Sequence, residues 1–160
     1  MRTREGLTYG IFSAVIPGWI FPGTTIVQAN TDPPHVSKVI SLVIEEVRRL
    51  KEKGVTRQEI SAAKRAMIAR FAGIFENLHD ALSATAFLEY RGRPLDFYVR
   101  YRERLASLKF KVINNAASNF LDPSELRILV AGNREKVKEA KPPLSRFGLV
   151  KEIPLRDPFK

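Results

Sequence analysis

The apolar run at residues 7–16, with the β-branched run after it at 23–30, constrains the fold of this chain more than any other feature. The first run reads LTYGIFSAVI, and both sides of its alternating pattern are largely apolar. Such a strand is expected to be central in its sheet and covered on at least one face. The second run, GTTIVQAN, suits a pleated surface. Because Pro17 and Gly18 interrupt the chain between them, the two runs are expected to form an antiparallel pair.

A series of helical patterns follows the two strands. Thr31 or Asp32 can cap the first helix, with Pro33 in its first turn, and Gly54 can end it. Thr56 and Glu59 then have the spacing of a capping box. The periodicity predicts helices at residues 33–53, 56–73, 75–91, 95–108 and 109–121. On the third of these, Leu78, Leu82, Phe87 and Leu88 are the expected core contacts, and Phe120 is expected on the apolar face of the fifth.

A short apolar run at residues 126–131 (LRILVA) predicts a returning third strand, and residues 133–160 form a basic, Pro-rich tail that is expected to dock on the surface. Two strands, several helices and one returning strand give an α+β fold, an antiparallel β-sheet covered by helices. Three strands make a thin sheet for so many helices. The chain is therefore expected to be a fragment of a larger sheet.

Composition limits the classes of function. The length of 160 residues fits one domain, and the absence of Cys excludes disulfides and thiol chemistry. A net charge of +10 allows a nucleic-acid-binding module, but the basic residues are mixed with acidic ones and no RNA-binding or helix-turn-helix pattern occurs. No apolar run suggests a membrane span, and no targeting segment is recognised within these 160 residues. The compartment stays open between cytoplasm and bacterial cell envelope.

No catalytic or metal-binding pattern stands out. The two histidines, His35 and His79, are far apart, and neither lies in an H-E-x-x-H or H-x-x-E-H motif. Both are expected to be surface or helix-end residues. G-x-S-x-G, Walker and G-x-G-x-x-G motifs are also absent. The sequence therefore predicts no catalytic residue, no metal ligand and no cofactor on this chain.

The stretch RTREGLTYG at residues 2–10 resembles a segment of the second, non-catalytic half of the inverted-motif zinc peptidases, the family of pitrilysin, insulin-degrading enzyme and mitochondrial processing peptidase. Arg2, Leu7 and Tyr9 have the matching spacing. The likeness continues through residues 22–67, with a "G-V-T-x-x-E" cap and an "A-K" helix, through 81–108, and through FLDPSELRILVAGN at 120–133. It covers about residues 2–157. The H-x-x-E-H zinc motif is absent, and the chain is shorter than a full half-domain.

This resemblance implies a metallopeptidase half-domain of the LuxS/MPP-like type, truncated at its N-terminal side, with residues 1–157 as one domain of a larger two-half protein. It implies that the zinc and its activated water belong to the other half. Arg2 would donate to a substrate carbonyl, and Tyr9 would place its hydroxyl near the scissile carbonyl and support the oxyanion. The expected partners are a zinc-bearing half, or a homologous subunit, and a peptide that adds as an edge strand.

Two alternatives follow from the same residues. The chain could be a structural, non-peptidase subunit of the same fold, similar to the core proteins of respiratory complexes, or a basic module that binds nucleic acid. Whether it is half of a zinc peptidase or a structural subunit of the same fold, the chain alone is expected not to hydrolyse peptides. A truncated sheet also predicts an exposed strand edge, and therefore self-association of the isolated chain.

Overall fold

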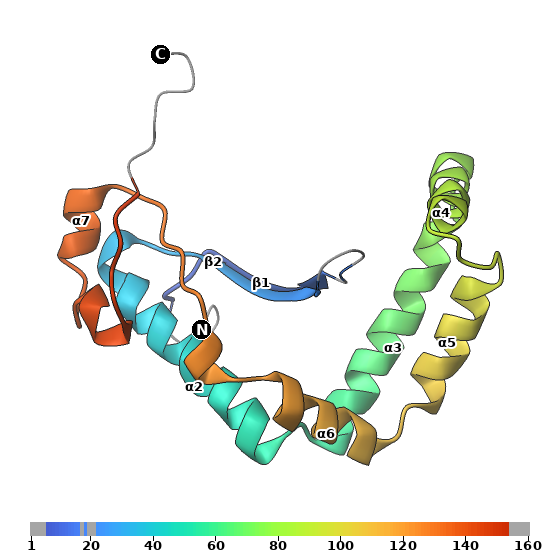
Figure 1. The fold of residues 1–160 in the computed structure, drawn as a ribbon, viewed down its shortest axis with the longest axis horizontal. Helices are drawn as coiled ribbons and strands as arrows, with labels where there is room; N and C mark the ends of the chain where they lie inside the picture. The colour runs from blue at the N-terminus through green and yellow to red at the C-terminus, as the bar shows by residue number, and fades with distance from the viewer. Residues whose placement is uncertain (1–5, 17, 19–21, 154–160) are drawn as a thin grey trace, which may run out of the picture. The chain divides into compact units, whose positions relative to one another are not determined.

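The computed structural model describes residues 6–16, 18 and 22–153. Its regular elements within this part are two antiparallel strands and six α-helices, with three short 3-10 helices, so the α+β prediction is confirmed. The chain divides into two compact units, one formed by Met1–Val47 and Pro123–Lys160 and the other by Arg48–Asp122. Figure 1 follows the elements along the chain. The two units are described separately below.

The first unit contains a two-stranded ribbon. Strand β1 (Gly10–Ile16) pairs with β2 (Thr24–Asn30), and the register places Gly10 opposite Asn30 and Ile16 opposite Thr24. This confirms the predicted antiparallel pair, which Figure 1 shows in blue. The expectation that β1 is central is wrong within the described chain, because β2 is its one ladder partner there. Apolar side chains are exposed on both faces, including Phe12 (54%) and Val15 (72%).

The predicted third strand at residues 126–131 is wrong. This segment has no regular secondary structure, and none of its backbone groups hydrogen-bonds to the backbone of another described residue. Leu129 is 86% exposed and Ile128 is 43% exposed. The apolar, β-branched composition is typical of a strand, but a strand also needs a neighbour that pairs with its N–H and C=O groups.

Helix α2 (Val36–Lys53) begins after a short 3-10 turn, η1 (Pro33–His35). The sequence predicted Thr31 or Asp32 as the cap. Asp32 does occupy the cap position, but its side chain makes no capping hydrogen bond. The hydroxyl of Thr31 instead donates to the carbonyl of Leu7. The predicted capping role is therefore wrong, because both side chains bond to the segment that leads into β1.

In the second unit, the α2–α3 turn is closed by the predicted signals. Gly54 has a positive φ of 66° and ends α2. The Thr56 N–H donates to Glu59 Oε2 at 2.7 Å, and the Glu59 N–H donates to Thr56 Oγ1 at 3.1 Å. This reciprocal pair is the capping box at the start of α3 (Arg57–Ile74). The helix boundaries here match the sequence patterns closely.

The remaining helices of this unit are α4 (Leu78–Tyr90), α5 (Phe97–Ser107) and α6 (Phe110–Phe120). Helix α5 packs against α3 (Figure 1), and Phe71 lies between Tyr98 and Tyr101, with ring centroids 6.2 Å and 5.3 Å away. Lys64 on α3 donates to the carbonyls of Ala106 and Leu108, at 2.8 Å and 2.6 Å, at the end of α5. This pairing satisfies carbonyls that a helix end leaves open.

Two apolar patterns were assigned to the wrong environment. Leu88 on α4 is buried as expected, but Leu78, Leu82 and Phe87 are 85%, 66% and 47% exposed. On α6, Phe120 is 86% exposed. Periodicity identifies the helix, while burial requires an opposing surface that these side chains do not meet within the described chain.

The C-terminal part of the first unit carries a short helix, α7 (Arg134–Lys138), inside the segment that was predicted to be a basic, Pro-rich tail. Asn133 caps it by accepting from the Lys136 N–H. Helix α7 packs against η1, and Arg134 pairs with Glu152 at 2.6 Å. The 3-10 helix η2 (Pro123–Glu125) precedes α7, and η3 (Leu144–Phe147) follows it. None of the helices in the described part of the chain is both long and apolar enough to cross a membrane.

Candidate functional site

Tyr9 is the one predicted site residue that the structure describes. It stands immediately before β1, and its N–H donates to the carbonyl of Asn30 at 3.0 Å. Thr8 beside it is buried, whereas the Tyr9 side chain is 73% exposed, as the alternation of an extended segment requires. Arg2, the other predicted peptide-binding residue, lies outside the described residues. The roles of both residues remain predictions.

The hydroxyl of Tyr9 is bonded to a carboxylate. It donates to both oxygens of Asp32, each at 3.3 Å. With the Thr31 hydroxyl bonded to the Leu7 carbonyl, two successive residues at the end of β2 hold the segment that enters β1. Sequence reasoning treated Thr31 and Asp32 as helix caps and missed this contact. The signal that would have found it is the hairpin register, since the end of β2 must lie beside the start of β1.

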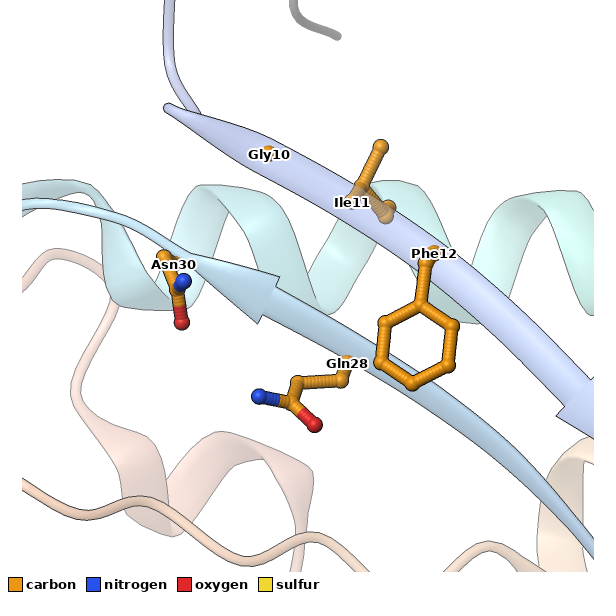
Figure 2. A pocket seen from close by; sticks show the side chains of 5 residues that line it. All are labelled: Gly10, Ile11, Phe12, Gln28 and Asn30. Atoms are coloured by element: carbon orange, nitrogen blue, oxygen red, sulfur yellow. The ribbon is translucent and has the colours of Figure 1, made fainter. Parts of the chain in front are cut away.

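The ribbon next to Tyr9 forms a shallow hollow of about 200 Å³, lined by Gly10, Ile11, Phe12, Gln28 and Asn30. Figure 2 shows Phe12 beside Gln28 on the ribbon, with Asn30 farther along β2. Gly10 contributes no side chain, so the backbone is accessible there. The hollow therefore combines an aromatic ring, two amide side chains and open backbone, which can accommodate an extended polypeptide.

Metal-binding side chains do not cluster among the described residues. Among them, no group of three His, Asp or Glu side chains lies close enough to hold a metal ion. His35 and His79 are both exposed and stand on different elements. What the ribbon can offer chemically is hydrogen bonding, through Tyr9, Asp32, Gln28 and Asn30, together with apolar contact through Phe12.

The resemblance inferred from the sequence is supported by comparison with known families. The model of the Peptidase M16 inactive domain matches residues 1–67. This segment holds the Tyr9 stretch, the β1–β2 ribbon, η1, α2 and the start of α3. The candidate site therefore lies inside the part of the chain that carries the family signal.

One similar protein is the "Non-peptidase homolog YmxG" of Helicobacter pylori, strain ATCC 700392 / 26695. The two sequences are 26% identical over 143 residues, which is 86% of this chain and 32% of that protein. The chain thus spans about a third of the length of this relative.

Proposed function

We propose, from the match of residues 1–67 to the Peptidase M16 inactive domain, that this chain supplies the non-catalytic half of a two-half protein and completes its peptide-binding chamber. The observation that carries the proposal is the exposed ribbon, with Tyr9 at its start, inside the matched segment. A zinc ion on the other half would supply the activated water for hydrolysis. This chain would supply binding surface and hydrogen bonds.

In this proposal an extended peptide lies along the ribbon and makes main-chain hydrogen bonds as an added strand. Tyr9, which is 73% exposed, contacts the peptide backbone near the reacting carbonyl, and Arg2 donates to a carbonyl of the peptide. The apolar side chains of Phe12 and Val15, which are more than half exposed, would contact peptide side chains on either face of the ribbon.

The test is reconstitution of cleavage. The full chain is mixed with a candidate zinc-bearing half, and cleavage of a quenched fluorescent peptide is followed. If Tyr9 binds the peptide, Tyr9→Phe should lower the rate of cleavage by about fivefold, the effect of removing one hydrogen bond to the bound peptide. Arg2→Ala should also remove most of the activity. Tyr90→Phe is the matched control, because Tyr90 is 83% exposed but lies outside residues 1–67.

A second candidate is a structural, non-peptidase subunit with the same two-half architecture. It is favoured by the name of the relative from Helicobacter pylori, a non-peptidase homolog, and by the Tyr9 hydroxyl donating to Asp32. An assembly that forms, carries zinc on the other half and still fails to cleave would favour this candidate. Cleavage that depends on Tyr9 would rule it out.

A further inference from the structure

We propose that Asp32 is a positioning residue for Tyr9, and that it makes the Tyr9 oxygen a hydrogen-bond acceptor toward a bound peptide. The inference rests on the proposed function, since it concerns the same peptide site. It specifies the ligand chemistry of that site: a peptide N–H, rather than a carbonyl oxygen or an oxyanion, is the group that Tyr9 would meet.

The direction of the Tyr9–Asp32 bond carries the argument. An ionised carboxylate has acceptor oxygens and no proton to donate. The phenol proton is therefore the one shared between Tyr9 and the two Asp32 oxygens, each 3.3 Å away. With its proton directed to Asp32, the Tyr9 oxygen presents lone pairs to the surrounding solvent.

The position of Asp32 explains why it is available for this contact. It stands at the cap position of η1, where an aspartate usually accepts from the backbone of the first turn, but its side chain makes no such bond. The turn is closed instead by the backbone, with the His35 N–H donating to the Asp32 carbonyl at 2.9 Å. The carboxylate is thus released from capping and directed to Tyr9.

The Tyr9 segment is also held by its backbone. Tyr9 N–H donates to the Asn30 carbonyl at 3.0 Å, and the Thr31 hydroxyl bonds the Leu7 carbonyl. Three consecutive residues at the end of β2 therefore fix an otherwise exposed tyrosine. A side chain fixed in this way loses little conformational freedom when a ligand binds, which favours affinity.

The negative charge of Asp32 also favours a peptide N–H as the partner of Tyr9. A carboxylate that contacts the phenol repels a second anion, including the oxyanion of a tetrahedral intermediate. It attracts N–H groups, which carry partial positive charge. Tyr9 and Asp32 together thus form an acceptor pair beside the open backbone of Gly10.

The experiment measures peptide affinity for the full chain and its variants. The probe is an uncharged fluorescent peptide of about ten residues, long enough to follow β1. A matched set of analogues replaces one backbone amide at a time by an ester, which removes one N–H donor. The variants are Tyr9→Phe, Asp32→Asn and the double variant. Ser13→Ala is the control, because Ser13 is an exposed residue of β1 that also carries a hydroxyl group.

We expect Tyr9→Phe and Asp32→Asn each to weaken binding of the amide peptide by about fivefold, the value of one hydrogen bond. The double variant should bind no more weakly than either single variant, because Asp32 acts through Tyr9. One ester analogue should bind the parent chain weakly and be insensitive to Tyr9→Phe. Ser13→Ala should leave every affinity unchanged.

Additive losses in the double variant would overturn the positioning role of Asp32, and equal sensitivity of every ester analogue to Tyr9→Phe would overturn the acceptor role. Either result would leave peptide binding, and with it the proposed function, intact. If the parent chain binds none of the peptides, the proposed function and this inference both fail.

Discussion

At the scale of single residues, Gly54 and Asn114 form the most specific contact in the second unit. The Asn114 side chain accepts from the Val55 N–H at 2.7 Å and donates to the Val55 carbonyl at 3.3 Å. A Cβ on Gly54 would lie 2.1 Å from Asn114 Oδ1, and Gly54 has a φ of +66°. Glycine thus meets two requirements there, a left-handed backbone and space for the amide.

Gly54→Ala should lower the free energy of unfolding by about 3 kcal/mol, from left-handed strain and the displaced Asn114 amide together. Gly73→Ala is the matched control. Gly73 stands in α3 without a positive φ, and a methyl group there would have nothing within 4 Å, so its change should stabilise the chain by about 1 kcal/mol. Urea unfolding of both variants measures the difference. Equal effects of the two changes would contradict this account.

Glu59 should make stability depend on pH in the acid range. The Thr56 N–H, then the Thr56 hydroxyl, and then the positive charge of Arg49 hold the pKa of Glu59 below its usual value of 4.5. A carboxyl whose pKa is lower in the folded state contributes stability above its unfolded pKa and loses it as pH falls through the folded value. That contribution should therefore be complete above about pH 4.5 and decline below it.

Thermal unfolding of Glu59→Gln against pH tests this directly. The variant should show a smaller fall in melting temperature below pH 4.5 than the parent chain. Glu103→Gln, a change of another exposed helical glutamate, should retain the parent's pH dependence. Parallel curves for the parent and Glu59→Gln would show that the capping box contributes nothing to acid sensitivity.

Individual residues predicted the structure correctly where their interaction partners are close in the sequence. The Thr56–Glu59 box and the Gly54 stop depend on atoms a few residues away, and both formed as predicted. Asp32 was predicted to be a cap by the same logic, yet its carboxylate bonds Tyr9, 23 residues earlier. A local sequence pattern carries no information on a partner that is distant along the chain. This is why the Tyr9–Asp32 contact of the candidate site was missed.

At the scale of elements, the contact between α3 and α5 depends on aromatic rings. Phe71 packs between Tyr98 and Tyr101, and Phe75 lies 5.7 Å from Tyr98. Phe71→Ala should cost about 2 kcal/mol of unfolding free energy, less than a fully buried phenylalanine because Phe71 is half-buried. Phe120→Ala, at a side chain that is 86% exposed, should change stability by less than about 0.5 kcal/mol. Chemical denaturation compares the two, and a larger loss for Phe120→Ala would refute the assignment.

The elements themselves were largely predictable, and their surroundings were not. Five helices and the hairpin follow from periodicity and turn residues. The run at residues 126–131 has the composition of a strand but lies unpaired within the described chain. Leu78 and Leu82 have the spacing of a buried face but are exposed. In each case the sequence specifies the local conformation, while pairing and burial depend on a second surface.

At the scale of the whole molecule, the amount of exposed apolar surface is the dominant feature. The buried apolar side chains among the described residues are Val39, Leu88, Leu105 and Ala140. Many larger ones, among them Tyr9, Val15 and Leu78, are more than 70% exposed. Along β1 the apolar residues Ile11, Phe12, Val15 and Ile16 are all exposed, and apolar patches on a surface mark interaction sites in soluble proteins. This agrees with a chain that functions against another polypeptide, as the proposed function requires.

The ribbon predicts self-association of the isolated chain. Strand β1 has one ladder partner in the described chain, so its other edge leaves N–H and C=O groups that can pair with a second ribbon. The net charge of +10 opposes this contact. Because salt screens repulsion between like charges, association should strengthen as ionic strength rises, the reverse of binding driven by opposite charges.

Sedimentation velocity over a wide concentration range checks this prediction. The average mass of the parent chain should rise with concentration, and Val15→Lys, at a β1 residue that is 72% exposed, should weaken association by about tenfold, because a lysine on an edge strand disfavours edge-to-edge pairing. Leu149→Lys is the control, because it adds the same charge at a fully exposed residue outside the ribbon. Equal weakening by both variants would assign the effect to charge alone, and a strictly monomeric parent at every concentration and salt would refute the exposed edge as an association site.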